Sequence, residues 1–509
     1  MMSGVHTDLN WAAAEAAARS VVDPWNSENG PGGAIIVFDT DNFRIESCGG
    51  LESLASSMPF SPDSIVRYAS ITKHILATMV LRHADRIGLD DPLSRHLPDL
   101  RKPMADVTVG RALDMTAGLP DVRESLSLLG ISVHTVTEAP TLLDFLYRHG
   151  ELNFTPGHEI SYSNTGYRLV EAALQKKRLF FNDWLQKEVS EPLDISFYAP
   201  EAWLDPVPGL VPGYWKSESG WQIGNAGLHL SASGSVTGSA RHLARWLQSV
   251  LADKGPGRDV LKSLSATRRL ADGRSTRYGL GMAWSEIGSH RFVGHGGSHA
   301  GYKAYFLLDP KSRAGMVVVS NREDTATFGV AQKVMAALVG ETLPVAATDI
   351  PEGLYVEDEG PCWLEMKNGV ATFLGTGETL YPAEDGWSVS LSAHLPMRLR
   401  WTGDAVEGEI GHAARRFVPV EPDDILSKID GRWVCPAEHA AFDITDGYLE
   451  TGVGPARIRF KLTSLGKGRV LMEGRDGPWE KRACLVFDGN RVLLALNRSR
   501  VVEYWRDGR

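Results

Sequence analysis

The last third of this chain has a different residue pattern from the rest. After Val339 about 160 residues consist of short alternating runs separated by glycine turns, a pattern typical of antiparallel β-structure. The earlier residues alternate between strand-like and helical patterns. The pattern changes at Gly340 to Pro351, a loop-like stretch with two prolines that indicates a linker. Since 509 residues exceed one ordinary core, we expect two or three domains.

The β-rich part contains an internal repeat. Gly353-Leu354-Tyr355-Val356 recurs as Gly431-Arg432-Trp433-Val434, and the hairpin signal Asn368-Gly369 recurs as Asp446-Gly447. Both pairs are 78 positions apart. Asn-Gly and Asp-Gly supply the positive φ angles of a two-residue type I′ turn. The repeat predicts two similar small antiparallel barrels, with chance recurrence of a short pattern as the alternative.

The second copy is longer than the first. The surplus of about nine residues falls in Gly466 to Trp479, which is dense in glycine and charge and predicts a protruding loop.

The first part predicts a sheet with helices inserted between its strands. Strand signals lie near both ends of this part, and helical periodicity lies between them. The strand signals are Ala34–Phe38, Tyr302–Leu308 and Gly315–Ser320, and the helical ones are Ser70–Ile87, Thr141–Tyr147 and Tyr167–Gln175. A sheet whose strands come from both ends of this segment is the economical arrangement.

A Ser-x-x-Lys motif, Ser70-Ile71-Thr72-Lys73, opens the first predicted helix. A spacing of three places both side chains on one helix face, and a desolvated lysine can lose its proton and act as a base. An ordinary N-cap serine is the alternative. The second match, Ser464-Leu465-Gly466-Lys467, follows β-type sequence, so its context differs.

Two further elements carry polar groups suited to hydrolysis. Tyr162 and Asn164 precede a predicted helix, where the phenol can relay a proton and the amide can hold a substrate carbonyl. His295-Gly296-Gly297 precedes a predicted strand, and its glycines allow the backbone to approach a substrate closely. The alternatives are a buried tyrosine beside a turn asparagine, and a plain glycine turn with a surface histidine.

Together these motifs resemble those of the penicillin-recognising serine hydrolases, the superfamily of serine β-lactamases and penicillin-binding proteins. Leu113–Leu119 is similar to the family's Leu-x-His-Thr-Ser-Gly-Leu segment, with Met115 and Ala117 at the His and Ser positions. Phe154-x-Pro156-Gly157 before Tyr162-Ser163-Asn164, and Tyr278-Gly279-Leu280-Gly281, also match. The order serine, tyrosine, Gly-Gly strand, at separations of 92 and 133 residues, is the family's as well. The resemblance covers roughly residues 30–335.

The resemblance implies an α+β fold. It consists of a β-lactamase-like catalytic domain, with an antiparallel sheet flanked by helices and a mostly helical subdomain, followed by two small antiparallel β-barrels. The expected boundaries are 1–340 for the catalytic domain, 341–352 for the linker, 353–420 for the first barrel and 421–509 for the second.

The resemblance also implies the roles of individual residues. Ser70 is the expected nucleophile, with Lys73 and Tyr162 managing its proton. Asn164, His295, Gly296 and Gly297 are expected to bind substrate, and the backbone N–H groups of Ser70 and Ser298 to form the oxyanion hole. The family's chemistry needs no metal or other cofactor.

The His-Gly-Gly motif departs from the Lys-Thr-Gly of most β-lactamases. Together with two C-terminal β domains it resembles bacterial D-aminopeptidases, serine hydrolases that release N-terminal D-amino acids from peptides or amides. In that group a loop of the last barrel reaches the active site, and an acidic residue on it meets the substrate's free amine. The surplus segment of the second copy supplies the counterpart here, with Asp476 or Glu473 as the anionic residue.

Several alternatives share these residues. A β-lactamase-like esterase or amidase differs from an aminopeptidase only in its pocket, and a catalytically inactive penicillin-binding-type protein has the same scaffold. A D-Ala-D-Ala carboxypeptidase is disfavoured because the N-terminus lacks a secretion signal.

The bulk composition limits the partners. A net charge of −10 argues against nucleic acid or an anionic membrane as a partner. The sequence contains no run of about 18 apolar residues, and its four cysteines have no paired spacing. We therefore expect a cytoplasmic protein acting on a small peptide or amide. The resemblance adds a homodimer.

Overall fold

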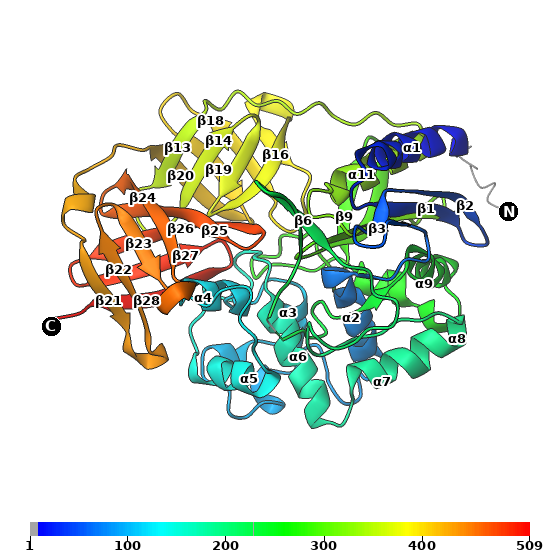
Figure 1. The fold of residues 1–509 in the computed structure, drawn as a ribbon, viewed down its shortest axis with the longest axis horizontal. Coiled ribbons are helices and arrows are strands. Elements are labelled where there is room, and N and C mark those ends of the chain that lie inside the picture. Colours follow the sequence, from blue (N-terminus) through cyan, green and yellow to red (C-terminus); the bar gives the residue numbers. More distant parts are fainter. Residues whose placement is uncertain (1–8, 228, 509) are drawn as a thin grey trace.

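The computed structural model describes residues 9–227 and 229–508 and divides into three parts (Figure 1). The first part carries a six-stranded sheet with helices on both faces, and each of the other two is a closed eight-stranded antiparallel barrel. This confirms the predicted α+β architecture. The expectation of no leader sequence rests partly on residues 1–8, which lie outside the described residues.

The central sheet is antiparallel and joins the two ends of the catalytic part. Its order is β2 (Phe43–Gly49), β1 (Gly33–Asp39), β12 (Ala314–Ser320), β11 (Tyr302–Asp309), β10 (His290–His299) and β9 (Ala283–Ile287). β1 pairs with β12 from Gly33↔Ser320 to Asp39↔Ala314. The expectation of strands from both ends of the segment is confirmed.

Helices cover both faces of this sheet, which explains why its central strands are apolar on both sides. Ile35 and Val37 of β1 pack under α1 (Trp11–Glu28) and α11 (Thr327–Val339). Ile36 and Phe38 belong to the larger core on the opposite face. That core includes α2 (Thr72–Arg82), α9 (Ala240–Ala252) and the helical subdomain. The subdomain contains α3 (Val109–Leu113), α4 (Val122–Leu128), α5 (Ala139–Arg148), α6 (Asn164–Lys176), α7 (Phe181–Leu185), α8 (Glu191–Leu193) and α10 (Val260–Leu264).

The two barrels follow one another and have the same strand order. The first contains β13 (Gly353–Glu357), β14 (Trp363–Lys367), β15 (Val370–Phe373), β16 (Thr376–Pro382), β17 (Ser388–Ser390), β18 (Met397–Trp401), β19 (Val406–Ile410) and β20 (Ala413–Pro419). The second contains β21 (Gly431–Cys435), β22 (Ala440–Thr445), β23 (Tyr448–Thr451), β24 (Ile458–Gly466), β25 (Arg469–Asp476), β26 (Trp479–Asp488), β27 (Arg491–Leu496) and β28 (Ser499–Arg506).

The repeated hairpins form equivalent turns. Asn368 and Gly369 have φ angles of 50° and 73°, and Asp446 and Gly447 have 51° and 75°. Positive φ at both positions is the type I′ geometry that the dipeptides predict. The repeat is therefore structural and not a chance recurrence.

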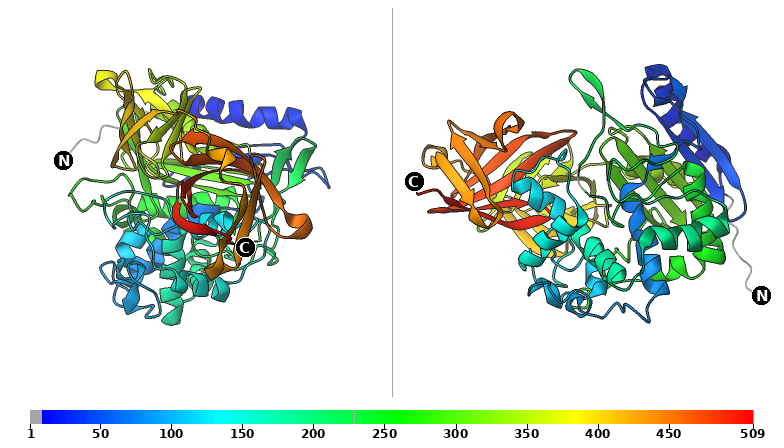
Figure 2. Two further views of the ribbon diagram at one scale, coloured as in Figure 1. Left: turned by 90° about the vertical axis from the view of Figure 1, so that its left-hand side faces the viewer. Right: turned by 60° about the horizontal axis from the view of Figure 1, so that its bottom comes forward.

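The surplus of the second copy is a long β-hairpin. β25 and β26 pair from Arg469↔Val486 to Asp476↔Trp479 and turn at Gly477-Pro478. The tip of this hairpin contacts the helical subdomain, because a Cβ on Gly477 would lie 2.9 Å from Nε2 of His134. The second barrel also lies beside α4 in two views (Figures 1 and 2).

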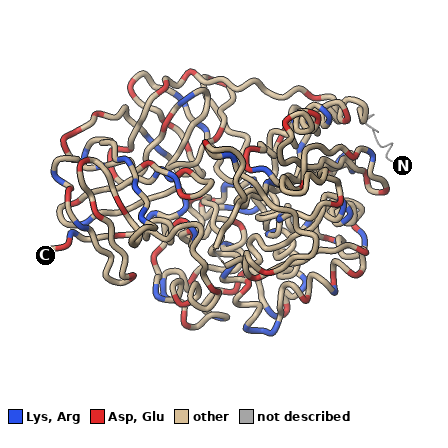
Figure 3. Tube along the Cα trace, viewed as in Figure 1, with Lys and Arg blue, Asp and Glu red and all other residues tan. Residues whose placement is uncertain are grey.

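Charged residues of both signs are interspersed over all three parts (Figure 3). Among the described residues, none of the helices is both long and apolar enough to cross a bilayer.

Candidate active site

Ser70 lies in a tight turn immediately before α2. The chain leaves β5 (Val66–Arg67), passes through the 3-10 turn Ala69–Ile71 and enters α2 at Thr72. The α-helix thus begins two residues later than the sequence predicts. Ala69 has a φ of 51°, a left-handed conformation that costs a non-glycine residue about 1 kcal/mol or more. Such local strain is characteristic of functional turns.

Lys73 lies in α2, one turn after Ser70, and its amine has three partners. Nζ is 3.0 Å from Oγ of Ser70, 2.8 Å from Oδ1 of Asn164 and 2.7 Å from the carbonyl oxygen of Ser233. The amide oxygen and the carbonyl can only accept hydrogen bonds. If the amine is neutral, its two N–H groups serve these acceptors and its lone pair faces the Ser70 hydroxyl. The geometry therefore suits proton transfer from Ser70 to Lys73.

The surroundings of Lys73 favour its neutral form. The side chain is buried, and burial holds the pKa of Lys73 well below its ordinary 10.5. The positive charges of Arg123 and Arg498 lower this pKa further, while Asp121 opposes them. Desolvation and like charges are the two means by which proteins generate a neutral lysine base.

Asp121 fixes the orientation of Asn164. Oδ2 of Asp121 accepts hydrogen bonds from Nδ2 and from the backbone N–H of Asn164, both at 2.7 Å. This contact leaves the amide oxygen of Asn164 directed at Lys73. Asp121 is the N-cap of α4, and its Oδ1 accepts from the first backbone N–H groups of that helix. Asp121 was not predicted as a site residue, although an Asp before a helical pattern is a capping signal.

Tyr162 packs against the same amine. Its ring centroid lies 4.9 Å from Nζ of Lys73, and its buried hydroxyl has no hydrogen-bond partner among the described residues. Burial raises the pKa of Tyr162, whereas the nearby Ser70 hydroxyl and Arg498 lower it. A buried phenol close to Ser70 is free to bond an atom of a bound substrate.

The glycine-rich strand β10 lies directly against the Ser70 turn. A Cβ on Gly297 would lie 1.9 Å from the carbonyl oxygen of Tyr68 and 3.1 Å from the backbone nitrogen of Ser70. Only glycine fits there. Ser298 follows on the same strand, and its Oγ accepts a hydrogen bond from Lys303 at 2.6 Å.

His295 is held by its own neighbours. Its Nδ1 lies 2.6 Å from the carbonyl oxygen of Gly296, so it donates there, and Nε2 accepts from the Tyr278 hydroxyl at 2.9 Å. Burial, together with nearby His394 and Lys73, holds the pKa of His295 well below 6.5. The imidazole is neutral, makes a hydrogen bond at each of its two nitrogens, and forms part of the pocket wall.

His394 comes from the first barrel and was not predicted. Its ring contacts Tyr162, Tyr278 and His295 at centroid distances of 5.4, 5.3 and 4.9 Å. Its Nδ1 is buried without a partner among the described residues. Nη2 of Arg277 in the catalytic part donates to two carbonyls of the loop that carries His394.

The hairpin of the second barrel reaches the site, but Asp476 bonds the protein itself. Its Oδ1 accepts from the Ser132 hydroxyl at 2.7 Å, and its Oδ2 from the Val133 backbone N–H at 2.8 Å. Glu473, the other acid considered, pairs with Arg482 on the neighbouring strand at 2.8 Å. Both acids therefore have protein partners, Ser132 and Val133 for Asp476 and Arg482 for Glu473.

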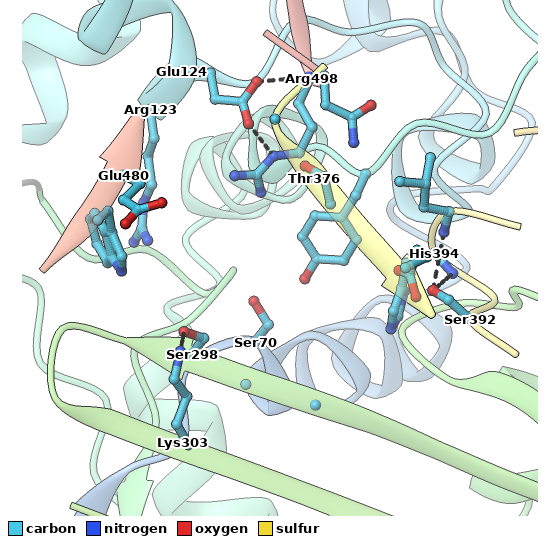
Figure 4. A pocket seen from close by; sticks show the side chains of 18 of the residues that line it. Ser70, Arg123, Glu124, Ser298, Lys303, Thr376, Ser392, His394, Glu480 and Arg498 are labelled. Carbon is cyan, nitrogen blue, oxygen red and sulfur yellow. Dashed lines mark hydrogen bonds and ion pairs between the residues drawn. The ribbon is translucent and has the colours of Figure 1, made fainter. Parts of the chain in front are cut away.

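All three parts of the chain line one cavity of 1240 Å³ around Ser70 (Figure 4). Its walls include Ser70, Tyr162 and Asn164 from the catalytic part, His394 from the first barrel, and Asp476 and Arg498 from the second. The residues expected from the first part of the sequence therefore meet at one site. The contribution of His394 from the first barrel depends on tertiary docking and has no local sequence signal, whereas the hairpin of the second barrel has one in its surplus length.

Comparison with known proteins agrees with this geometry. The model of the Beta-lactamase family matches residues 17–341, more than half of the chain. D-aminopeptidase of Gluconobacter oxydans is 26% identical over 356 residues, covering 67% of this chain and 64% of the relative. D-aminopeptidase of Brucella anthropi is 23% identical over 359 residues, covering 67% and 66%. The matched region thus spans just under two thirds of each relative.

Solved structures share the fold. An octameric penicillin-binding protein homologue from Pyrococcus abyssi aligns with a TM-score of 0.55 at 18% identity, covering 96% of this chain and 99% of that one. D-amino acid amidase from Ochrobactrum anthropi SV3 aligns with a TM-score of 0.54 at 21% identity, covering 64% and 99%. With the extent of the family match and the Ser70–Lys73 geometry, these findings show that the chain belongs to the Beta-lactamase family.

Proposed function

We propose that this protein is a serine hydrolase that releases N-terminal D-amino acids from short peptides and amino acid amides through an acyl-enzyme. The observation that carries the proposal is the amine of Lys73, with two pure acceptors on one side and the Ser70 hydroxyl on the other. The similarity to D-aminopeptidases and the matching fold of a D-amino acid amidase support the substrate class.

The proposed reaction has two halves. Oγ of Ser70 attacks the substrate carbonyl carbon while Lys73 takes the hydroxyl proton. The C–N bond then breaks, and the proton passes through Lys73 and Tyr162 to the leaving amine. Water attacks the resulting ester and gives its proton back through the same groups, which frees the amino acid and restores Ser70. The N–H groups of Ser70 and Ser298 stabilise the oxyanion, typically by about 3 kcal/mol each.

The other expected residues have supporting roles in this proposal. Asn164 orients Lys73 and offers its amide to the substrate, while Gly296 and Gly297 let the substrate backbone lie along β10. His295 shapes the wall beside Tyr278. Asp476 binds the segment at Ser132 and Val133, and so fixes the hairpin at the rim of the cavity.

A hydrolysis panel tests the substrate class. The purified protein is given D-alanine amide, L-alanine amide and N-acetyl-D-alanine amide, and ammonia release is measured. We expect kcat/KM for the D-amide to exceed that for the L-amide by about 10²-fold, and acetylation to reduce it by a similar factor. Equal rates for both enantiomers would remove the D-aminopeptidase proposal, and faster turnover of a short ester or a β-lactam would favour an esterase or β-lactamase.

Two broader expectations also remain proposals. We propose that the protein works in the cytoplasm. We also propose that it forms a homodimer, as the resemblance to D-aminopeptidases implies. Sedimentation of the purified protein at working concentration tests the second.

A further inference from the structure

The charged residues around the Ser70 cavity are mostly neutralised by one another. Three ion pairs each join two lining residues, namely Glu124–Arg498 at 2.6 Å, Lys303–Glu323 at 2.7 Å and Arg475–Glu480 at 3.1 Å. Two more lining residues, Asp324 and Arg482, pair with neighbours outside the lining.

The charged side chains of Asp476 and Lys481 also have hydrogen-bond partners within the protein. Besides the contacts of Asp476 with Ser132 and Val133, Nζ of Lys481 donates to the Ser127 carbonyl at 2.9 Å. Burial lowers the pKa of Lys481 to about 8, and the negative charge of Asp476 opposes this shift.

Two lining charges of opposite sign remain, Arg123 and Glu378. Among the described residues, neither takes part in an ion pair, and the Arg123 guanidinium makes no hydrogen bond. Asp121, the acid near Arg123, already accepts from backbone N–H groups and from Asn164. Burial raises the pKa of Glu378 to about 7, and the neighbouring Ser392 hydroxyl opposes this shift. An uncompensated charge in such surroundings is costly unless a ligand neutralises it.

The two charges belong to opposite walls of the cavity. Arg123 is on α4, close enough to the catalytic group for its charge to lower the pKa of Lys73. Glu378 is on β16 beside Ser392, in the first barrel. In Figure 4, Arg123 and Ser392 lie on either side of Ser70.

We infer that the site is built for a dipeptide with both ends free, whose ammonium group binds Glu378 and whose carboxylate binds Arg123. This inference rests on the proposed function. In a dipeptide the two charged groups flank the single peptide bond. In the cavity, Arg123 and Ser392, the neighbour of Glu378, lie on either side of Ser70. Each further residue in an extended chain moves the carboxylate by up to about 3.3–3.6 Å, so longer peptides lose the Arg123 contact. A guanidinium is well suited to bind a carboxylate with two parallel hydrogen bonds.

Paired substrates test the Arg123 contact. D-Ala-Gly and D-Ala-Gly amide differ only in the terminal carboxylate. Loss of the Arg123 charge near Lys73 should affect both substrates alike. We therefore expect Arg123→Gln to lower the ratio of kcat/KM for D-Ala-Gly to kcat/KM for the amide by about 10-fold or more, because only D-Ala-Gly loses a charge-assisted hydrogen bond. Arg123→Lys keeps the charge and should retain part of the preference. If Arg123→Gln reduces kcat/KM for both substrates by the same factor, the carboxylate contact is refuted.

A second pair tests Glu378. D-alanine amide and D-lactamide differ by an amine against a hydroxyl. Glu378→Gln is nearly isosteric and should lower the ratio of their kcat/KM values by about 10-fold. An unchanged ratio refutes the amine contact.

Control variants and the wild type separate the possible failures. Arg19→Gln on α1 and Glu384→Gln in the first barrel change exposed residues outside the cavity, and both should keep wild-type ratios. One outcome is that the wild type hydrolyses D-alanine amide while the Arg123 and Glu378 variants keep the wild-type kcat/KM ratios for the paired substrates. That result overturns this inference and leaves the proposed function standing. No hydrolysis by the wild type overturns the proposed function itself.

Discussion

Replacing Ser70 by alanine is expected to reduce amide hydrolysis by about 10³-fold or more while leaving the fold intact, since loss of a covalent nucleophile removes most of the transition-state stabilisation that the catalytic group supplies. The only side-chain hydrogen bond formed by Oγ of Ser70 among the described residues is the one to Lys73. The thermal midpoint of unfolding should therefore change little. Activity is followed by ammonia release and folding by circular dichroism.

The chain offers a matched control for this variant. Ser464 begins the second Ser-x-x-Lys match, but it lies on β24 in the second barrel and its hydroxyl donates to Asp423 at 2.8 Å. Ser464→Ala should keep wild-type activity. A Ser70→Ala protein that retains more than a few per cent of activity would show that another group attacks the substrate.

Lys73→Arg is expected to lower kcat/KM by about 10² to 10⁴-fold, the usual contribution of a positioned general base. Arginine keeps a positive charge in the same place, but its guanidinium does not lose a proton at any working pH. Burial lowers the pKa of Lys73, so the base is available well below pH 10.5. In the wild type, kcat/KM should rise with pH as Lys73 loses its proton, and this limb should vanish in Lys73→Arg.

Lys467→Arg is the corresponding control, because Lys467 pairs with Asp358 on an exposed turn. It should leave both the rate and the pH profile unchanged. If Lys73→Arg retains the activity and the pH limb of the wild type, Lys73 does not act as the base.

The two Ser-x-x-Lys matches show why context decides such a motif. Ser70 and Lys73 meet because a 3-10 turn leads directly into a buried helix. The apolar periodicity after Ser70 predicts the helix, although not the turn. Ser464 and Lys467 share the spacing, but a β-strand ends between them and their side chains bond different acids. The residue periodicity around each motif therefore correctly distinguishes the helical match at Ser70 from the β-strand match at Ser464.

Residues contributed by docking were beyond the reach of the sequence. His394 lies in a short loop, and only packing of the first barrel places its ring against Tyr162 and His295. The long hairpin was predicted from its surplus length, and it does reach the cavity. Its acid was assigned by analogy, and nothing in the sequence indicates that the carboxylate of Asp476 accepts hydrogen bonds from Ser132 and Val133. The local sequence pattern predicts where a strand or a turn forms. The hydrogen-bond partner of a side chain depends instead on the domain surface against which that side chain packs.

The most direct test of the account is the mass of the intact protein after reaction with a fluorophosphonate or a penicillin-like acylator, followed by peptide mapping. We expect a single added group on the peptide containing Ser70, and no addition to the Ser70→Ala protein. An unmodified wild-type protein, or a group attached to another residue, would contradict a Ser70 nucleophile activated by Lys73.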